Sequence, residues 1–255
     1  MNKMSIDSVK IKECLKFLQR YFVGVNDVAF VEYPRSLVYG SEEWLIYIFY
    51  SCLLDYGMRS KIYHSNLTRT YEIYPEIFVP KVVVNQYSNC SDRLLTILKE
   101  NVHPRYPNVA VDKWIHLSKE LARYESVREL VLSFKSFDEL SCFIRKIKGY
   151  GQKTGGLLLR LISDSGICHF NDEIKAIPLD RHDIEICYLN GIIDKVKLNS
   201  LEVDELSHSL ICGGKEIGLS PSVVDQYLWE IGNTFCNKKD CLKCPLGSVC
   251  KRKIK

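Results

Sequence analysis

Four cysteines are crowded into fifteen residues near the end of the chain: Cys236, Cys241, Cys244 and Cys250. Thiolates are the ligands of structural zinc and of iron–sulfur clusters, and a Cys-x2-Cys step suits both. Four unligated thiols this close together would be open to oxidation. We therefore expect a metal centre here, and the spacing alone leaves tetrahedral zinc and a [4Fe–4S] cluster as alternatives.

A second chemical group follows a glycine hairpin, where Gly149 and Gly151 precede Lys153. The glycines let the backbone approach a phosphate, and amides at a helix N-terminus favour an anion. The helix dipole and the neighbouring cations favour a neutral amine on Lys153, which is the form that attacks carbon. Those cations are Arg145, Lys146 and Lys148. The alternative is a plain DNA clamp in which the lysine only touches phosphate.

Three segments resemble one family, the endonuclease III-like branch of the helix-hairpin-helix DNA glycosylases. IKGYGQKTGGLLLR at 147–160 is similar to its helix-hairpin-helix, with Lys153 where bifunctional members carry their nucleophile. WEIGNTFCNKKDCLKCPLGSVCK resembles its C-terminal cluster loop, although four residues separate the first two cysteines where the family usually has six. PLDRHDIEI at 178–186 resembles its Asp-x-His segment, which makes Asp180 the catalytic aspartate.

The chemistry of Asp180 suits this assignment. A carboxylate can stabilise positive charge on a deoxyribose as the base leaves, and it can orient the attacking amine. The same aspartate follows Pro178 and can also cap the next helix, which is compatible with catalysis. Asp183 is a weaker candidate for the role. The 27 residues from Lys153 to Asp180 are closer to the spacing of archaeal 8-oxoguanine glycosylases than to that of typical endonuclease III.

The resemblance implies a bifunctional glycosylase and AP lyase of base excision repair. It would remove 8-oxoguanine or an oxidised pyrimidine from double-stranded DNA through a lysine Schiff base and then nick the strand. The cofactor would be a [4Fe–4S] cluster. Two alternatives stay open: a monofunctional glycosylase for mismatched or deaminated bases, and a non-enzymatic helix-hairpin-helix DNA-binding module with a zinc-bound tail.

The positions of several other residues predict what they contact. The expected DNA contacts lie in the hairpin and the cysteine loop: Lys148, Gly149, Gly151, Gln152, Thr154, Lys238, Lys239 and Lys243. Leu53 or Leu54 stands where the family has a glutamine that fills the gap left by a flipped base, so the wedge residue is unassigned. Trp44, Tyr56, Tyr106 and Trp114 are candidates for the base pocket, with core packing as the simpler interpretation.

The apolar spacing of the elements that would carry these residues is mainly helical. Segment 80–89 could form a short strand, a loop or the start of a helix, and segment 164–175 is predicted to be a loop. Ser136 and Glu139 form a capping-box pattern before the hairpin. The resemblance implies a six-helix lobe of 31–175, with the helix-hairpin-helix at 136–163, and a cluster lobe of 1–30 plus 176–255. Helices are expected at 9–22, 42–56, 59–74, 92–100, 112–124, 126–133, 136–147, 154–163, from Asp180 and at 220–233.

Composition narrows the class further. The 255 residues are 46% hydrophobic and 26% charged, which is typical of a globular protein. The net charge is +4, yet residues 236–255 hold seven Lys or Arg and one acid, which suits a phosphate backbone. We find neither a signal peptide nor an apolar run of membrane-spanning length, and therefore expect an intracellular monomer. We expect the remaining seven cysteines to be buried and to behave as small hydrophobic residues.

Overall fold

The computed structural model describes residues 4–22, 32–56, 60–170 and 177–251, and within these ranges the chain is mainly helical. The described residues form no β-strand beyond one isolated bridge between Ile6 and Ile193. The chain divides into two compact units, residues 1–28 with 174–255 and residues 29–173. The boundaries predicted from the sequence, at 30/31 and 175/176, lie outside the described residues.

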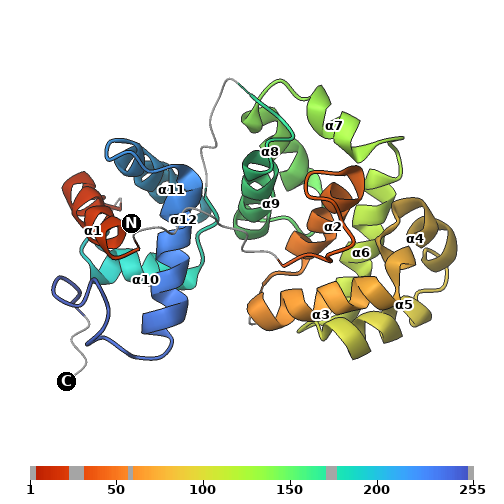
Figure 1. The fold of residues 1–255 in the computed structure, drawn as a ribbon, viewed down its shortest axis with the longest axis horizontal. Helices are drawn as coiled ribbons and strands as arrows, with labels where there is room; N and C mark the ends of the chain where they lie inside the picture. The colour runs from red at the N-terminus through yellow and green to blue at the C-terminus, as the bar shows by residue number, and fades with distance from the viewer. Residues whose placement is uncertain (1–3, 23–31, 57–59, 171–176, 252–255) are drawn as a thin grey trace. The chain divides into compact units, whose positions relative to one another are not determined.

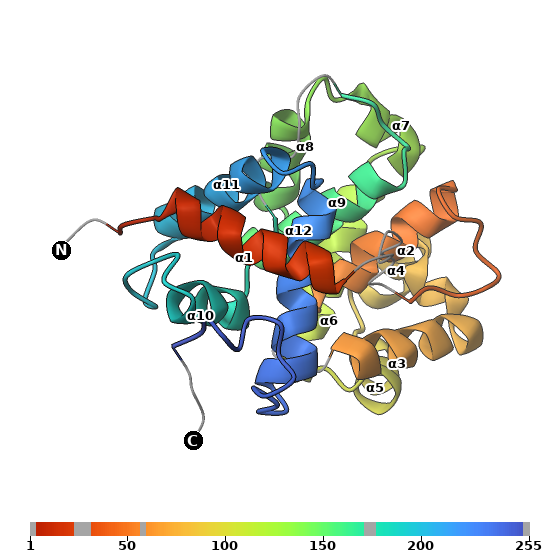
Figure 2. The same ribbon diagram turned by 60° about the vertical axis from the view of Figure 1, so that its left-hand side comes forward.

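The first unit joins both ends of the chain. Asp7 begins its first helix by accepting hydrogen bonds from the amides of Val9 and Lys10. That helix packs against two later helices, and the three share an apolar core that includes Leu18, Leu210 and Leu228 (Figures 1 and 2). The described elements of this unit are α1 (Ser8–Tyr21), α10 (Arg181–Leu189), α11 (Ser200–Lys215), α12 (Pro221–Glu230) and the π-helical turn η3 (Ile231–Cys236).

The second unit is built around α2 (Glu42–Leu53), whose residues are mostly buried on every side. The continuous apolar run from Trp44 to Leu54 therefore marks a core helix, which packs against α6, α7 and α9. The other described elements are α3 (Ser60–Ile73), η1 (Pro75–Phe78), α4 (Pro80–Tyr87), α5 (Asp92–Ile97), η2 (Leu98–Val102), α6 (Pro107–Leu121), α7 (Val127–Ser133), α8 (Phe137–Lys146) and α9 (Gln152–Asp164).

Several expectations about the elements need correction. The segment 80–89 is helical in α4, because Pro80 starts the helix and Val83 packs into the core against α6. The described part of this unit holds eight α-helices, α2 to α9, of which the predicted α5 and α7 are short. The predicted helix at 112–124 begins five residues earlier, at Pro107. Helix α11 was not predicted.

Among the described helices, none combines the length and the apolar character that crossing a membrane requires.

Candidate active site and cysteine loop

The hairpin that carries Lys153 is shaped by its first glycine and by Thr154. Gly149 has φ +110°, a backbone conformation that L side chains rarely adopt. The Thr154 hydroxyl accepts a hydrogen bond from the amide of Gly151 at 3.0 Å, and it lies 3.2 Å from the carbonyl oxygen of Gly149, to which it donates. Thr154 is only 5% exposed and closes the hairpin, which leaves little of its side chain for the DNA contact expected from the sequence.

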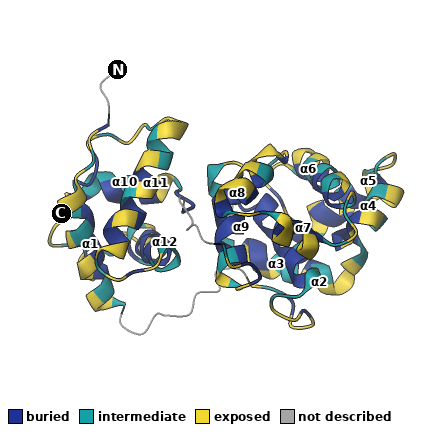
Figure 3. Cartoon of the chain, turned by 90° about the horizontal axis from the view of Figure 1, so that it is seen from above, coloured by how far each residue is buried: buried dark blue, intermediate teal, exposed yellow. Residues whose placement is uncertain are grey.

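Both helices of the motif have a defined start. Ser136 caps α8 by accepting from the amide of Glu139 at 3.1 Å. The Glu139 carboxylate reaches back to the amide of Lys135 at 2.8 Å, one residue before the position expected of a capping box. Helix α9 then begins at Gln152, directly after the hairpin, and its middle is almost wholly buried (Figure 3).

The hairpin rests on the end of α2. The Tyr150 hydroxyl donates to the carbonyl oxygen of Phe49, and the two aromatic rings meet edge to face. A Cβ added to Gly149 would lie 2.7 Å from Cδ1 of Leu53. Leu53 and Leu54 are 0% and 1% exposed, so both belong to the core and neither is available as the wedge.

Lys153 lies in the first turn of α9 and is half-buried. The cation expected beside it, Lys148, is already paired, because its Nζ lies 2.6 Å from an oxygen of Asp112. Another cation, Lys113, sits over the Tyr56 ring at 4.1 Å from the ring centroid. Because the Asp112 carboxylate offsets the charge of Lys148, the surroundings of the hairpin are less positive than the sequence suggests.

Sequence reasoning missed the buried carboxylate of Asp55, which follows α2 and is 4% exposed. Ser60 donates to its Oδ1 at 2.8 Å, and Nε2 of His64 lies 3.5 Å from its Oδ2. Burial alone raises the pKa of Asp55. Contact with His64, attraction by the Lys153 charge and the Ser60 hydrogen bond outweigh it and hold that pKa below its ordinary value.

Asp180, in the other unit, caps α10. Its Oδ1 accepts from the amides of His182 at 2.7 Å and Asp183 at 3.2 Å, as its position after Pro178 suggested. The buried Asp183 returns the interaction by accepting from the amide of Asp180 at 2.7 Å. Burial, together with the negative charges of Asp180 and Asp225, raises the pKa of Asp183 well above its ordinary value. The surroundings of Asp183 thus favour the neutral form of its carboxyl, which braces the backbone of Asp180.

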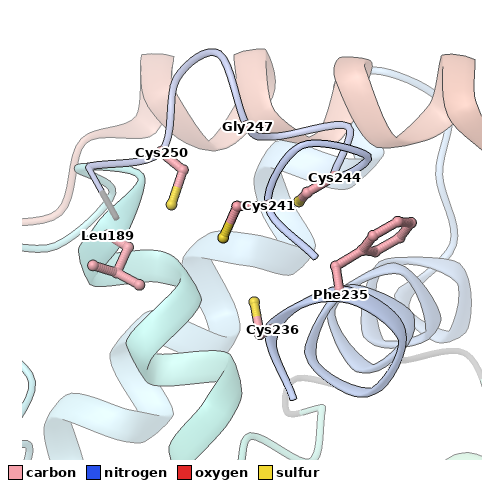
Figure 4. Close-up of a pocket in the computed structure, with 7 residues that line it drawn as sticks. All are labelled: Leu189, Phe235, Cys236, Cys241, Cys244, Gly247 and Cys250. Atoms are coloured by element: carbon pink, nitrogen blue, oxygen red, sulfur yellow. The ribbon is translucent and has the colours of Figure 1, made fainter. Parts of the chain in front are cut away.

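The four C-terminal cysteines line one pocket. Figure 4 shows their side chains around it, between the end of η3 and Leu189 of α10. The pocket encloses about 370 Å³, counting the open space at its mouth. The loop coils tightly at Gly247, where an added Cβ would meet the carbonyl oxygens of Cys241 and Cys244 at 2.6 and 3.0 Å. Sequence reasoning missed this glycine, although its place between two of the cysteines was a signal.

These thiols are not gathered around a point. Within the described ranges, no group of three or more His, Cys, Asp or Glu side chains could hold a single metal ion. A zinc ion with thiolates at about 2.3 Å requires four sulfurs in close mutual contact. In a four-iron cluster each thiolate binds a different iron, so the ligands surround a larger space. Four thiols around one pocket are the donor set that such a cluster would require.

Other predicted residues are placed as follows. Lys238, Lys239 and Lys243 are exposed on the cysteine loop, and Lys243 lies 3.6 Å from Asp240. Gly151 is exposed and Gln152 is half-buried. Trp44 and Trp114 are core residues, whereas Tyr106 is 51% exposed. Of the seven scattered cysteines, four are buried as expected and three are exposed: Cys90, Cys142 and Cys212.

Comparison with solved structures finds related folds. The 8-oxoguanine DNA glycosylase of Methanocaldococcus jannaschii aligns with a TM-score of 0.59 and 20% identity, over 89% of this chain and 94% of that one. The chain has the fold of the 8-oxoguanine DNA glycosylases. The enzyme of Thermotoga maritima gives a TM-score of 0.61 at 19% identity, covering 88% and 97%. The Methanocaldococcus glycosylase/lyase bound to a 15mer DNA containing 8-oxoguanine gives 0.57 at 18%, covering 87% and 88%. Neither a protein-family model nor a curated sequence matches the chain.

Proposed function

We propose that the protein is a bifunctional DNA glycosylase and AP lyase that removes an oxidised base, with 8-oxoguanine as the first candidate. The observation that carries the proposal is the position of Lys153, at the start of α9 directly after the hairpin, in a chain with this fold. A monofunctional glycosylase needs no such amine, and a plain DNA clamp needs no aspartate such as Asp180, which caps α10 in the first unit. The protein would act as a monomer on double-stranded DNA.

The reaction begins when the damaged nucleotide leaves the base stack and exposes its glycosidic carbon. The nitrogen of Lys153 forms a bond to C1′ while the glycosidic bond breaks, and the departing base takes the electron pair and a proton. The carboxylate of Asp180 stabilises the positive charge that develops on the sugar. Opening of the sugar ring leaves a Schiff base, and loss of a C2′ proton then expels the 3′ phosphate.

We further propose that Cys236, Cys241, Cys244 and Cys250 bind a [4Fe–4S] cluster. The pocket that the four thiols share supports a bound metal group, and the resemblance of the loop to the family's cluster loop favours the cluster over zinc. The cluster would hold the loop in shape, so that the exposed Lys238, Lys239 and Lys243 contact phosphates. An iron and sulfide assay with a visible absorption spectrum tests it. Zinc at one atom per chain and a colourless protein would refute it.

Borohydride trapping tests the activity. Duplexes that each carry one defined lesion (8-oxoguanine, an oxidised pyrimidine or an abasic site) are incubated with protein and reductant. Wild type should form a covalent adduct, and Lys153→Ala should form none. Lys81→Ala is the control, because this exposed lysine of α4 pairs with Glu125 and lies outside the hairpin of the same unit. If wild type traps no substrate, the lyase proposal is wrong, and trapping by Lys153→Ala would show that another residue is the nucleophile.

A further inference from the structure

Lys113 of α6 is a half-buried lysine that packs directly onto the hairpin. A Cβ added to Gly149 would lie 3.0 Å from its Cδ and 3.3 Å from its Cγ, so the stem of the lysine covers the bare Cα of that glycine. Its Nζ lies 4.1 Å from the centroid of the Tyr56 ring. The side chain therefore runs from α6 across the hairpin to a tyrosine that follows α2, and both its stem and its ammonium group are in contact.

The preceding residue of α6 contacts the hairpin as well. Asp112 pairs with Lys148 at 2.6 Å, next to the contact between Lys113 and Gly149. Consecutive residues of α6 thus contact consecutive residues of the hairpin, and α6 itself packs against α2 (Figure 1). A side chain supported by packed elements holds its functional group in one place. The ammonium of Lys113 consequently has a defined position beside the hairpin.

Lys113 makes no ion pair within the part of the chain that the structure describes. Asp112 contacts Lys148 instead, and the buried Asp55, directly before Tyr56, contacts two residues of α3. A ring face attracts a cation, but it does not replace the strong acceptors that the three donors of an ammonium group can take. The hairpin thus carries a positive group that is held in place and can still bind an anion.

We propose that Lys113 binds a phosphate of the DNA backbone next to the hairpin, and that the Tyr56 ring and the backbone of Gly149 hold its ammonium group for this contact. The inference rests on the proposed function, because the anion is the DNA on which the enzyme would act. Phosphate contacts fix the register of a protein on a duplex, so Lys113 is a binding residue and takes no part in bond breaking. It replaces Lys148, whose charge is offset by Asp112, as the main cation of the hairpin.

The salt dependence of DNA binding tests this contact. A labelled duplex that carries a tetrahydrofuran abasic-site analogue forms no Schiff base, and its binding is followed by fluorescence anisotropy between about 50 and 200 mM KCl. Lys113→Met keeps an apolar stem over Gly149 but removes the charge. The slope of log K against log salt concentration should fall in magnitude by about 0.9, and the affinity should fall roughly three- to ten-fold. A merely structural role would lower the urea midpoint and leave the slope unchanged.

Lys119→Met is the matched control. Lys119 is exposed on the same helix, about two-thirds of a turn away around the helix axis, and its loss should change neither the slope nor the affinity. Lys113→Arg keeps the charge and should keep the slope.

Tyr56→Leu keeps the charge of Lys113 but removes the ring beneath it. Binding should weaken with little change in slope, and this loss should disappear in the Lys113→Met background, because the two residues act through one contact. Losses that simply add would show that the ring does not act through the lysine, and they would overturn its holding role.

A footprint on the wild-type protein covers the case in which a variant does not fold. Acetylation by acetic anhydride, quantified by mass spectrometry, is compared between the free protein and the complex with saturating duplex. DNA should slow the labelling of Lys113 several-fold and leave that of Lys119 unchanged. Equal labelling of Lys113 with and without DNA, or an unchanged slope in folded Lys113→Met, overturns the inference.

The same measurements distinguish the failure of this inference from the failure of the proposed function. Wild type that binds the duplex through Lys113 but traps no lesion would refute the lyase function and leave the phosphate contact standing. Wild type that traps a lesion but shows no dependence on Lys113 would refute the contact alone. Wild type that binds no duplex at low salt would refute both.

Discussion

Replacing Gly149 with alanine tests whether the hairpin geometry is set by the fold. The residue has φ +110°, and holding an L side chain there costs about 1–3 kcal/mol. The new Cβ would also lie 2.7 Å from Cδ1 of Leu53 and 3.0 Å from Cδ of Lys113. Leu53 is fully buried and cannot turn away, so overpacking adds roughly 1–2 kcal/mol, the lower part of the usual range. We expect Gly149→Ala to lose about 2–5 kcal/mol of unfolding free energy.

Gly151 is the matched control in the same hairpin. Its φ of −98° and ψ of −164° are open to any residue, and an added Cβ would meet nothing within 4 Å. Gly151→Ala should stay within about 1 kcal/mol of wild type, because lower unfolded-state entropy offsets a poorer N-cap. The lack of a side chain at Gly151 can also serve to let a phosphate approach the backbone. In that case Gly151→Ala should bind duplex DNA roughly three- to ten-fold more weakly at fixed salt, as expected for one lost hydrogen bond.

Urea unfolding followed by tryptophan fluorescence provides the measurement. Trp44 and Trp114 are buried in the same unit as the hairpin, so a Trp229→Phe background makes the signal report that unit. With a slope of about 2 kcal/mol per molar urea, Gly149→Ala should lower the midpoint by roughly 1–2.5 M. An unchanged midpoint would refute the steric reasoning. Equal losses in the two variants would show that the hairpin needs glycine for a reason other than φ and contact.

Three further predictions follow from individual contacts. Glu42 accepts from the Ser126 hydroxyl and the amides of Val127 and Arg128 at 2.7–2.9 Å, so Glu42→Ala should cost about 1–3 kcal/mol in urea unfolding, unlike the exposed neighbour change Glu43→Ala. The raised pKa of Asp183 means that the fold loses stability as pH rises above the ordinary aspartate pKa; Asp183→Asn should raise the melting temperature at pH 7, with the gain vanishing near pH 4. Cys241→Ser should lose iron and visible absorption, whereas the exposed Cys142→Ser should keep both.

The features that could be predicted from the sequence depend on residues that lie close together along the chain. The hairpin, its Ser136 cap and the Asp180 cap each depend on residues within a few positions of one another. The four cysteines are similarly local, and they do line one pocket. The exposed Cys142 is the opposite case, because no local pattern distinguishes it from a buried cysteine.

The features that could not be predicted depend on tertiary packing. The valines of 80–87 favour a strand or a helix equally well, and burial of Val83 against α6 decides for the helix. The pairing of Lys148 with Asp112 removes a cation that sequence reasoning counted near the nucleophile. Asp55 lies far from Lys153 in the sequence, so only the packing of α2 against α9 brings its charge within reach.

Asp55 and Asp183 show how packing gives one residue type opposite roles in the two units. Both are buried, and burial raises the pKa of each. Donors from His64 and Ser60 and the charge of Lys153 reverse the effect at Asp55, which stays an anion beside a cationic nitrogen. The like charges of Asp180 and Asp225 reinforce the effect at Asp183 and favour its neutral form. A carboxamide should therefore mimic the carboxyl of Asp183 but not the carboxylate of Asp55.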